Sequence, residues 1–129
     1  MTGANKLPFK PAPSTGSQSV DAEHGVQLGL LDAALSAFDP EGSGDAAELI
    51  DQLHIYTQAH FMSEQLLLRL AARANYDAHI EDHELLMKEL DETRILLGRG
   101  NHAGARDRLR SHHGHLLDHI RSWDRSIKD

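Results

Sequence analysis

The sequence predicts an all-α protein: an antiparallel, up-down-up-down four-helix bundle with an extended N-terminal arm. Three observations predict this fold class. Apolar residues recur every three or four positions in four segments, which is the period of a helix with one buried face. Short polar or glycine-containing segments separate the four, so consecutive helices should run antiparallel. No segment alternates convincingly between apolar and polar residues, as a half-buried strand would.

The arm should cover residues 1–19, which contain three of the four prolines together with serine and glycine. Residues 20–129 would then form the bundle domain. The first helix should begin at Val20 and stop at the DPEGSG segment, residues 39–44. Its predicted inner face consists of His24, Leu28, Leu31, Leu35 and Phe38.

The second helix should open with a capping box formed by Asp45 and Glu48, and it should end near Ala72. Its predicted inner face contains Leu49, Leu53, Tyr56, His60, either Ser63 or Glu64, and Leu67.

The third and fourth helices follow the same period. The third should end at the glycines of LGRGN, residues 97–101, with Tyr76, His79, His83, Leu86, Met87, Leu90 and Leu97 facing inward. The fourth should run nearly to the C-terminus despite Gly114, which costs roughly 1 kcal/mol relative to alanine. Its inner face would contain Leu109, either His112 or His113, Leu116, His119, Trp123 and Ile127.

Composition narrows the function classes. The chain has 129 residues, which is one domain's length. Its formal net charge of −7, from 20 acidic and 13 basic residues, argues against nucleic acid or an anionic membrane surface as partner. No segment has the length and apolarity of a membrane span, and the lack of cysteine fits a reducing compartment, so we expect a cytoplasmic location. Without cysteine, only His, Asp and Glu remain as strong metal ligands.

Five of the ten histidines fall on predicted inner faces: His24, His60, His79, His83 and His119. In an antiparallel hairpin, residues equidistant from the turn lie side by side. His24 and His60 are centred on position 42, and His83 and His119 on position 101, both inside predicted loops. Glu64 and His79 are centred on 71.5, at the edge of the loop between the second and third helices. The five histidines should therefore meet in one layer, where a metal centre would make such a buried cluster favourable.

Spacing indicates how this layer could bind metal. Residues four apart point to one side of a helix, so His60 can act with Glu64, and His79 with His83. Asp124, five residues after His119, enters from a different angle, which suits a bridging carboxylate. Five imidazoles and two carboxylates exceed the three or four protein ligands of a single zinc ion, so we predict two ions. Iron, manganese and zinc all suit this ligand set.

The same residues resemble the hemerythrin signature, in order: His24, then HFMSE at 60–64, HIEDH at 79–83 and HIRSWD at 119–124. The resemblance implies a non-haem di-iron centre that binds O₂ reversibly. In that arrangement His79, His83 and His119 would hold one iron. His24 and His60 would hold the other, which keeps an open position for O₂. Glu64 and Asp124 would bridge the two irons together with an oxo or hydroxo group.

Apolar walls should keep water and protons away from bound O₂. Our candidates for this pocket are Leu28, Phe61, Leu116 and Ile120, each with an ordinary core role as an equal alternative. Two positions depart from the pattern of bacterial hemerythrins, which often have a second glutamate where Gln65 stands and a tryptophan where His115 stands.

His115 could either line the O₂ pocket or be a solvated residue of the run HHGH. If it faces the pocket, we expect faster autoxidation than in a tryptophan-bearing relative. Gln65 should change little. We assign the other four histidines to the surface: His54, His102, His112 and His113.

Three functional classes stay open. The first is an O₂-binding protein, not an enzyme, that acts as carrier, store or supplier to an oxygen-using enzyme, and we favour it because no output domain follows the bundle in this chain. The second is an oxygen or redox sensor that acts through a signalling protein. The third is a di-iron enzyme that handles peroxide or nitric oxide. A ferritin-like oxidase is disfavoured, because no glutamate in the sequence has a histidine three residues later.

Overall fold

The computed structural model describes residues 18–38, 45–70 and 76–122. In these ranges it contains four helices and no strand: α1 (Gln18–Ser36), α2 (Ala46–Leu70), α3 (Tyr76–Gly98) and α4 (His102–Ser122). The predicted fold class is confirmed. The arm expected over residues 1–19 lies outside the described residues except for its last two, which belong to α1, and Trp123, Asp124 and Ile127 also lie outside them. None of the described helices is long and apolar enough to cross a membrane.

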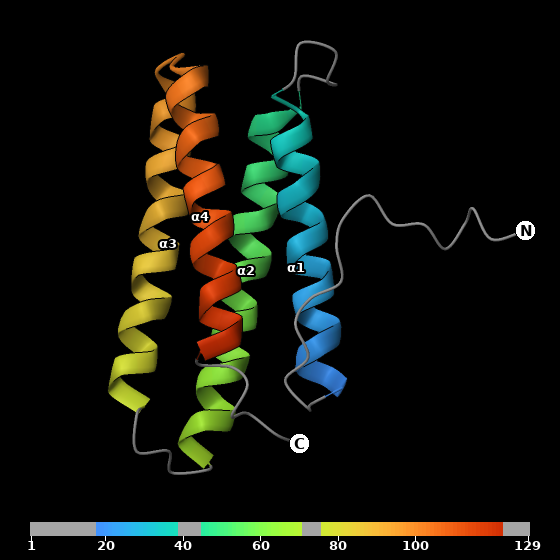
Figure 1. The fold of residues 1–129 in the computed structure, drawn as a ribbon, viewed down its shortest axis with the longest axis vertical. Coiled ribbons are helices and arrows are strands. Elements are labelled where there is room, and N and C mark those ends of the chain that lie inside the picture. Colours follow the sequence, from blue (N-terminus) through green and yellow to red (C-terminus); the bar gives the residue numbers. More distant parts are fainter. Residues whose placement is uncertain (1–17, 39–44, 71–75, 123–129) are drawn as a thin grey trace, which may run out of the picture.

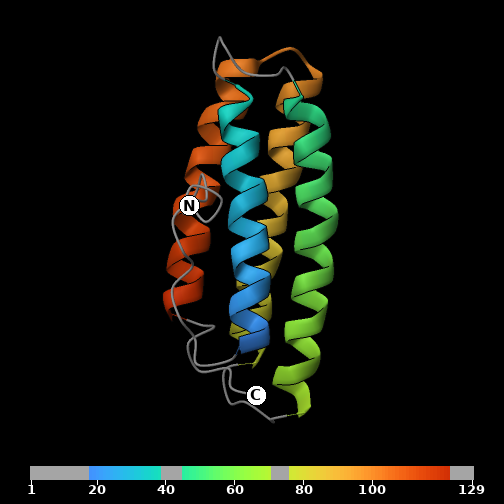
Figure 2. The ribbon, with the colours of Figure 1, turned by 90° about the vertical axis from the view of Figure 1, so that its right-hand side faces the viewer.

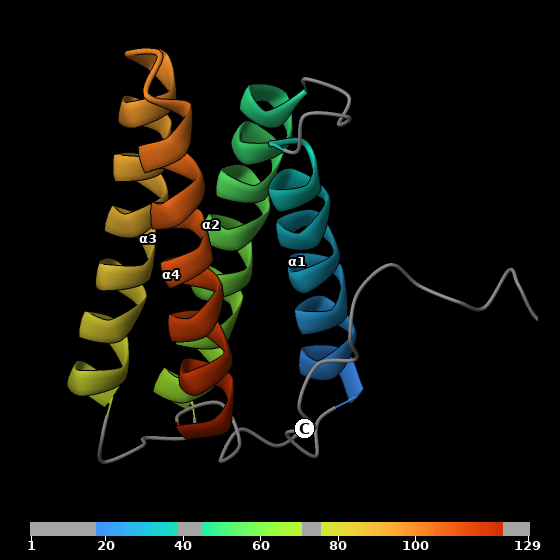
Figure 3. The same ribbon diagram turned by 45° about the horizontal axis from the view of Figure 1, so that its top comes forward.

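The helices form a closed ring in chain order. Figure 1 shows α1 and α3 running upward and α2 and α4 running downward, so neighbours along the chain are antiparallel. Each helix packs on the one before and after it, and α4 closes the ring against α1. The side view in Figure 2 places α1 between α4 and α2, and the tilted view in Figure 3 separates the α3–α4 pair from the α1–α2 pair. The bundle therefore encloses one central axis lined by all four helices.

A short turn ends α3 and begins α4. Gly100 has φ of 79°, in the left-handed region that favours glycine. Its N–H donates to the Leu97 carbonyl at 3.0 Å, and the N–H of Asn101 donates to the Leu96 carbonyl at 2.9 Å, which together form a Schellman motif. The Asn101 side chain then caps α4 by accepting from the Gly104 N–H at 2.9 Å. This tight turn fixes the register of α3 against α4.

Two apolar layers enclose the middle of the bundle. The larger core contains Leu28, Leu31, Ala34, Ile50, Leu53, Phe61, Leu86, Leu90, Leu109, Leu116 and Ile120. A smaller layer contains Val20 and Leu68, with Tyr76 packed against them. His24 lies one helical turn from Val20 and one from Leu28, and Glu64 lies one turn from Leu68. The level at which the predicted histidines occur is therefore closed by apolar side chains at both ends.

The inner face of α2 differs from the predicted one at several positions. Its buried residues include Ile50, Thr57, Glu64 and Leu68, whereas Leu67 is 37% exposed. Spacings of four residues carry the buried stripe from Glu64 to Leu68 and leave Leu67 at its edge. The prediction left Ser63 and Glu64 open, and the structure turns the glutamate inward.

Candidate metal centre

Six predicted ligands come together in one buried cluster. Its members are His24 from α1, His60 and Glu64 from α2, His79 and His83 from α3, and His119 from α4. None is more than 2% exposed. We call these six residues the candidate cluster. Because all four helices contribute, the cluster exists only in the assembled bundle.

Ring distances confirm the level prediction. The ring centroids of His24 and His60 are 4.9 Å apart, and those of His83 and His119 are 4.8 Å apart. His79 lies 4.9 Å from His119 by the same measure. The residues paired by their distance from each loop are therefore neighbours in space.

Glu64 lies at the centre and divides the histidines into two groups. Its Oε2 lies 3.1 Å from His24 Nε2 and 2.8 Å from His60 Nε2. Its Oε1 lies 3.0 Å from His83 Nε2 and 3.9 Å from the Nε2 atoms of both His79 and His119. Within each group the potential ligand atoms lie within 4.8 Å of one another. We call these the two-histidine group and the three-histidine group, with Glu64 common to both.

Partners on the outer side orient three of these rings. The Nδ1–H of His60 donates to Glu23 Oε1 at 2.6 Å, and that of His119 donates to Asp82 Oδ2 at 2.6 Å. His83 Nδ1 lies 3.3 Å from Gln65 Oε1. Such partners fix the tautomer and turn Nε2 toward the centre, as they do for metal-binding histidines in general. Gln65, which we expected to matter little, thus contacts a member of the cluster.

The donor set favours a bound cation. A neutral His60 that donates from Nδ1 to Glu23 presents its Nε2 lone pair to the carboxylate of Glu64, 2.8 Å away. Two acceptors at this distance repel each other, and either a second proton on His60 or a cation between them removes the conflict. With several imidazoles around one carboxylate, protons on all of them would overcharge a buried site. The residues present therefore fit a metal centre.

The pKa values of the cluster residues reflect two opposing effects, burial and contact with neighbouring ionisable groups. Burial raises the pKa of Glu64, but the surrounding histidines outweigh it and hold the pKa well below its usual range. Burial lowers the pKa of His60, but its contacts with Glu64 and Glu23 outweigh that effect and raise the pKa. For His83 burial wins, and the pKa is lowered despite the contact with Glu64. Glu64 is therefore an anion at neutral pH, and His83 is a neutral ring with a lone pair to donate.

The predicted pocket residues are all buried, and the one aromatic residue among them, Phe61, makes ring contacts with the cluster. Leu28, Phe61, Leu116 and Ile120 belong to the larger core. The Phe61 ring stacks on His83 at a centroid distance of 3.9 Å and an interplanar angle of 5°. Phe61 and His83 also line a surface pocket of about 410 Å³ between α2 and α3. On that side, His83 of the cluster itself borders the surface pocket.

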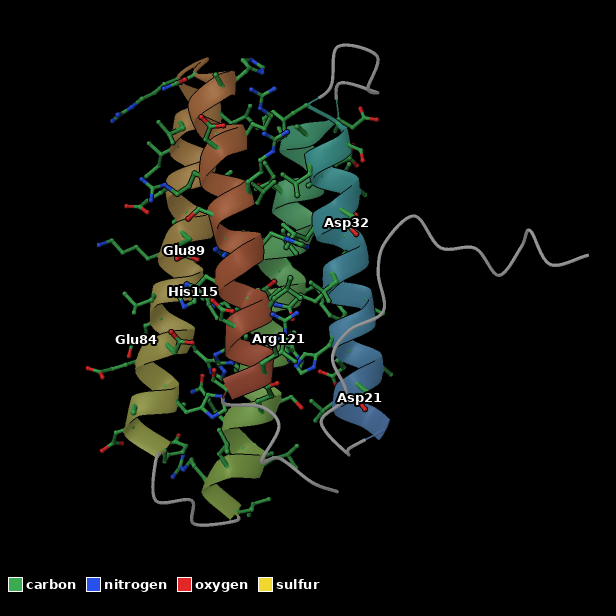
Figure 4. All side chains as sticks on the ribbon, viewed as in Figure 1. Asp21, Asp32, Glu84, Glu89, His115 and Arg121 are labelled. Atoms are coloured by element: carbon green, nitrogen blue, oxygen red, sulfur yellow. The ribbon has the colours of Figure 1, made fainter. Side chains whose placement is uncertain are left out.

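His115 is held by two carboxylates of α3, so it is not simply a solvated residue of the run HHGH, and its place in an O₂ pocket stays a prediction. It lies between α3 and α4, 26% exposed, with Nε2 2.7 Å from Asp82 Oδ1 and Nδ1 2.6 Å from Glu89 Oε2. Figure 4 shows Glu89 and His115 together at the contact between these helices. Its link to the cluster runs through Asp82, which also accepts from His119.

One surface assignment is wrong. His112 is fully buried, because its Nδ1–H donates to Glu89 Oε1 at 2.9 Å and thereby satisfies a polar group inside the bundle. His102 is exposed, and His54 and His113 are partly exposed. The seventh predicted ligand, Asp124, lies outside the described residues.

Sequence reasoning missed the outer partners Glu23, Asp82 and Glu89. Glu23 and Asp82 each directly precede a predicted ligand in the chain, but each contacts a histidine of a neighbouring helix instead. Spacing rules relate residues on one helix, so they contain no signal for such contacts. A search for acidic residues at the edges of the inner faces could have found them.

Comparison with known proteins agrees with a metal-binding role for the cluster. The family model described as "Hemerythrin HHE cation binding domain" matches residues 15–129. Proteins named Bacteriohemerythrin from Pseudomonas paraeruginosa and Pseudomonas aeruginosa are each 29% identical over 117 residues, which is 90% of this chain and 75% of the relative. No solved structure matches the chain significantly.

Proposed function

Because the chain belongs to the hemerythrin family, we propose that it binds O₂ reversibly at a di-iron centre and acts as an oxygen carrier, store or supplier. One observation carries the proposal. The buried imidazoles divide between the two oxygens of a single carboxylate, three on Oε1 and two on Oε2 of Glu64. This division is the one expected for two metal ions that share a bridging glutamate.

The two groups would hold one iron each. His79, His83 and His119 would bind the first iron, and His24 and His60 the second, with Glu64 as a bridge. Asp124 remains our proposed second bridge, in the segment that follows α4. The ion with fewer protein ligands would keep the open coordination position that a small ligand needs.

Two iron ions bound there would supply the electron pair that reversible O₂ binding requires. The chain's own residues determine the surroundings. Glu64 would contribute negative charge to both metal sites, and Glu23 and Asp82 hold two of the rings in orientation. The apolar layers above and below exclude water from the site, which strengthens electrostatic interactions inside it and limits proton leakage. Phe61, Leu28, Leu116 and Ile120 are our proposed walls.

The first experiment measures iron content and the visible absorption spectrum of the iron-loaded protein. We expect two irons per chain and an absorption band that appears when the reduced protein meets O₂ and disappears on degassing. Glu64→Gln should lower the iron content and abolish the band. Glu84→Gln is a matched control, because Glu84 is an exposed carboxylate on α3 (Figure 4), and it should leave both unchanged.

Other results would change the conclusion. A wild-type chain that holds no more than one iron would contradict the assignment of two groups. Oxidation by O₂ that degassing does not reverse would contradict carrier function. In that case a redox sensor acting through a partner protein, or an enzyme that handles peroxide or nitric oxide, becomes the better description, and steady-state turnover separates the two.

A further inference from the structure

An alternating row of imidazoles and carboxylates leads away from the candidate cluster between α3 and α4. His119 Nδ1 lies 2.6 Å from Asp82 Oδ2, and Asp82 Oδ1 lies 2.7 Å from His115 Nε2. His115 Nδ1 lies 2.6 Å from Glu89 Oε2, and Glu89 Oε1 lies 2.9 Å from His112 Nδ1. We call these five residues the outer relay. Each carboxylate uses both oxygens to join two rings.

Geometry determines the protonation of His115. An ionised carboxylate can only accept hydrogen bonds, and both ring nitrogens of His115 face carboxylate oxygens at 2.7 Å or less. Both nitrogens must therefore carry protons, which makes the ring an imidazolium cation. Burial lowers the pKa of His115, but the hydrogen bonds to Asp82 and Glu89 outweigh it and raise the pKa.

Both carboxylates stay ionised beside this cation. Each oxygen of Asp82 faces a ring nitrogen, His119 Nδ1 at 2.6 Å and His115 Nε2 at 2.7 Å, and two such donors favour the ionised carboxylate. Burial raises the pKa of Glu89, but contacts with His112 and His115 reverse the effect and lower it. Burial lowers the pKa of His112, which therefore stays neutral. Two anions thus flank one cation at the edge of the cluster.

A carboxylate that accepts the outer N–H of a metal-binding histidine makes that histidine a stronger electron donor. Asp82 is in this position toward His119, but its second oxygen is engaged by His115. We propose that His115 is a positioning residue for the metal centre: as a fixed cation it holds Asp82 on His119 and weakens the electron donation from Asp82 to that ligand. This inference rests on the proposed function, in which His119 binds iron.

The inference predicts the opposite of a pocket role. A histidine that brought water or protons to bound O₂ would speed autoxidation. A cation that withdraws charge from a ligand raises the reduction potential of the iron and slows autoxidation. Replacing His115 with a neutral residue therefore separates the two ideas by the sign of the change.

The first test needs no metal. Long-range ¹H–¹⁵N NMR of the metal-free protein at pH 7 distinguishes an imidazolium ring from either neutral tautomer. We expect the His115 signals to have the imidazolium pattern, and Glu89→Gln to move them toward the neutral one. A neutral His115 ring in the wild-type protein overturns the inference whether or not iron binds.

The second test measures the midpoint potential and the autoxidation rate of iron-loaded variants. His115→Gln removes the positive charge, so its potential should fall and its autoxidation should accelerate by roughly tenfold, the low end of the effects seen for partners of metal ligands. His115→Arg keeps a cation with two outward N–H groups and should restore values near wild type. His54→Gln is a matched control, because His54 lies 2.9 Å from Asp91 in a separate contact between α2 and α3.

The outcomes also separate this inference from the proposed function. If His115→Gln binds two irons with an unchanged potential, or if its potential rises, the inference is wrong and the di-iron proposal stands. If the wild-type chain binds no iron, the proposed function is wrong, and the metal-free NMR measurement still decides the charge of His115. If His115→Gln does not fold, the comparison of wild type with His115→Arg and Glu89→Gln provides the same test.

Discussion

Replacing Glu23 or Asp82 with the matching amide should weaken one metal site at a time. Glu23 accepts from His60 of the two-histidine group, and Asp82 accepts from His119 of the three-histidine group. Gln and Asn keep the size and the accepting oxygen but lose the negative charge. Each substitution therefore acts on one ring of one group and leaves the shared Glu64 in place.

The structure sets the expected magnitudes. Both contacts measure 2.6 Å, and a hydrogen bond to a charged partner is roughly twice as strong as a neutral one. Loss of such a partner weakens metal binding by roughly 10- to 100-fold, or about 1.4–2.7 kcal/mol. The Glu23 side chain is 36% exposed and is partly screened by solvent, whereas that of Asp82 is 16% exposed. We expect about tenfold for Glu23→Gln and closer to a hundredfold for Asp82→Asn.

Titration of the metal-free protein with Co²⁺, followed by calorimetry, can resolve the two sites. The three-histidine group offers more ligands and should account for the tighter binding event. Asp82→Asn should weaken the tighter event, and Glu23→Gln the weaker one, while Glu84→Gln should alter neither. The reasoning is refuted if both variants weaken both events equally, because the outer partners would then stabilise the fold as a whole rather than one ring each.

Three further predictions concern stability. Gly114→Ala should raise the free energy of unfolding by about 0.5–1 kcal/mol, since a Cβ there meets open space. Gly104→Ala should lower it, since a Cβ would come within 2.6–2.9 Å of the Asn101 side chain and displace it from its capping contact with the Gly104 N–H. Urea unfolding of both variants checks the contrast. The pKa of His115 is higher in the folded protein than its unfolded value of 6.5. The protonated ring therefore stabilises the fold fully below pH 6.5, and this stabilisation is lost as the pH rises through the pKa of the folded state. The destabilisation by His115→Gln in metal-free protein should thus be larger at pH 6 than at pH 9, and equal values would contradict the charged ring. Chelation should lower the unfolding temperature, because free metal at a hundred times its Kd stabilises the fold by about 2.7 kcal/mol per site, and an unchanged melting curve would mean that no metal had been bound.

The sequence was sufficient for the fold because helical periodicity and loop positions are local properties. The C-terminal end of α3 could be predicted from the glycines of LGRGN, and Gly100 does follow it as a left-handed residue. The inner face of α2 was less certain. A stripe read from leucines alone favours Leu67, but the helix also has to bury Glu64, and Leu68 follows Glu64 by one turn.

The layer of the candidate cluster was predictable for a similar reason. Antiparallel helices convert distance from a loop into height along the bundle, so His24 could be matched with His60 without coordinates. The outer relay was not predictable in this way. Whether His112 is buried or solvated depends on Glu89 of another helix, and the position of His115 depends on Asp82 and Glu89 together. Both depend on contacts between α3 and α4, which no local sequence pattern contains.

The two histidine groups come from different parts of the chain, so their residues are synthesised at different times. A nascent chain that has emerged only as far as Leu70 already contains His24, His60 and Glu64, the complete two-histidine group. The three-histidine group requires His119, near the end of the last helix. Since a domain generally folds as a unit, a ribosome-bound fragment contains the residues of one half of the site before those of the other half have been made, and the site itself forms only when α4 completes the bundle.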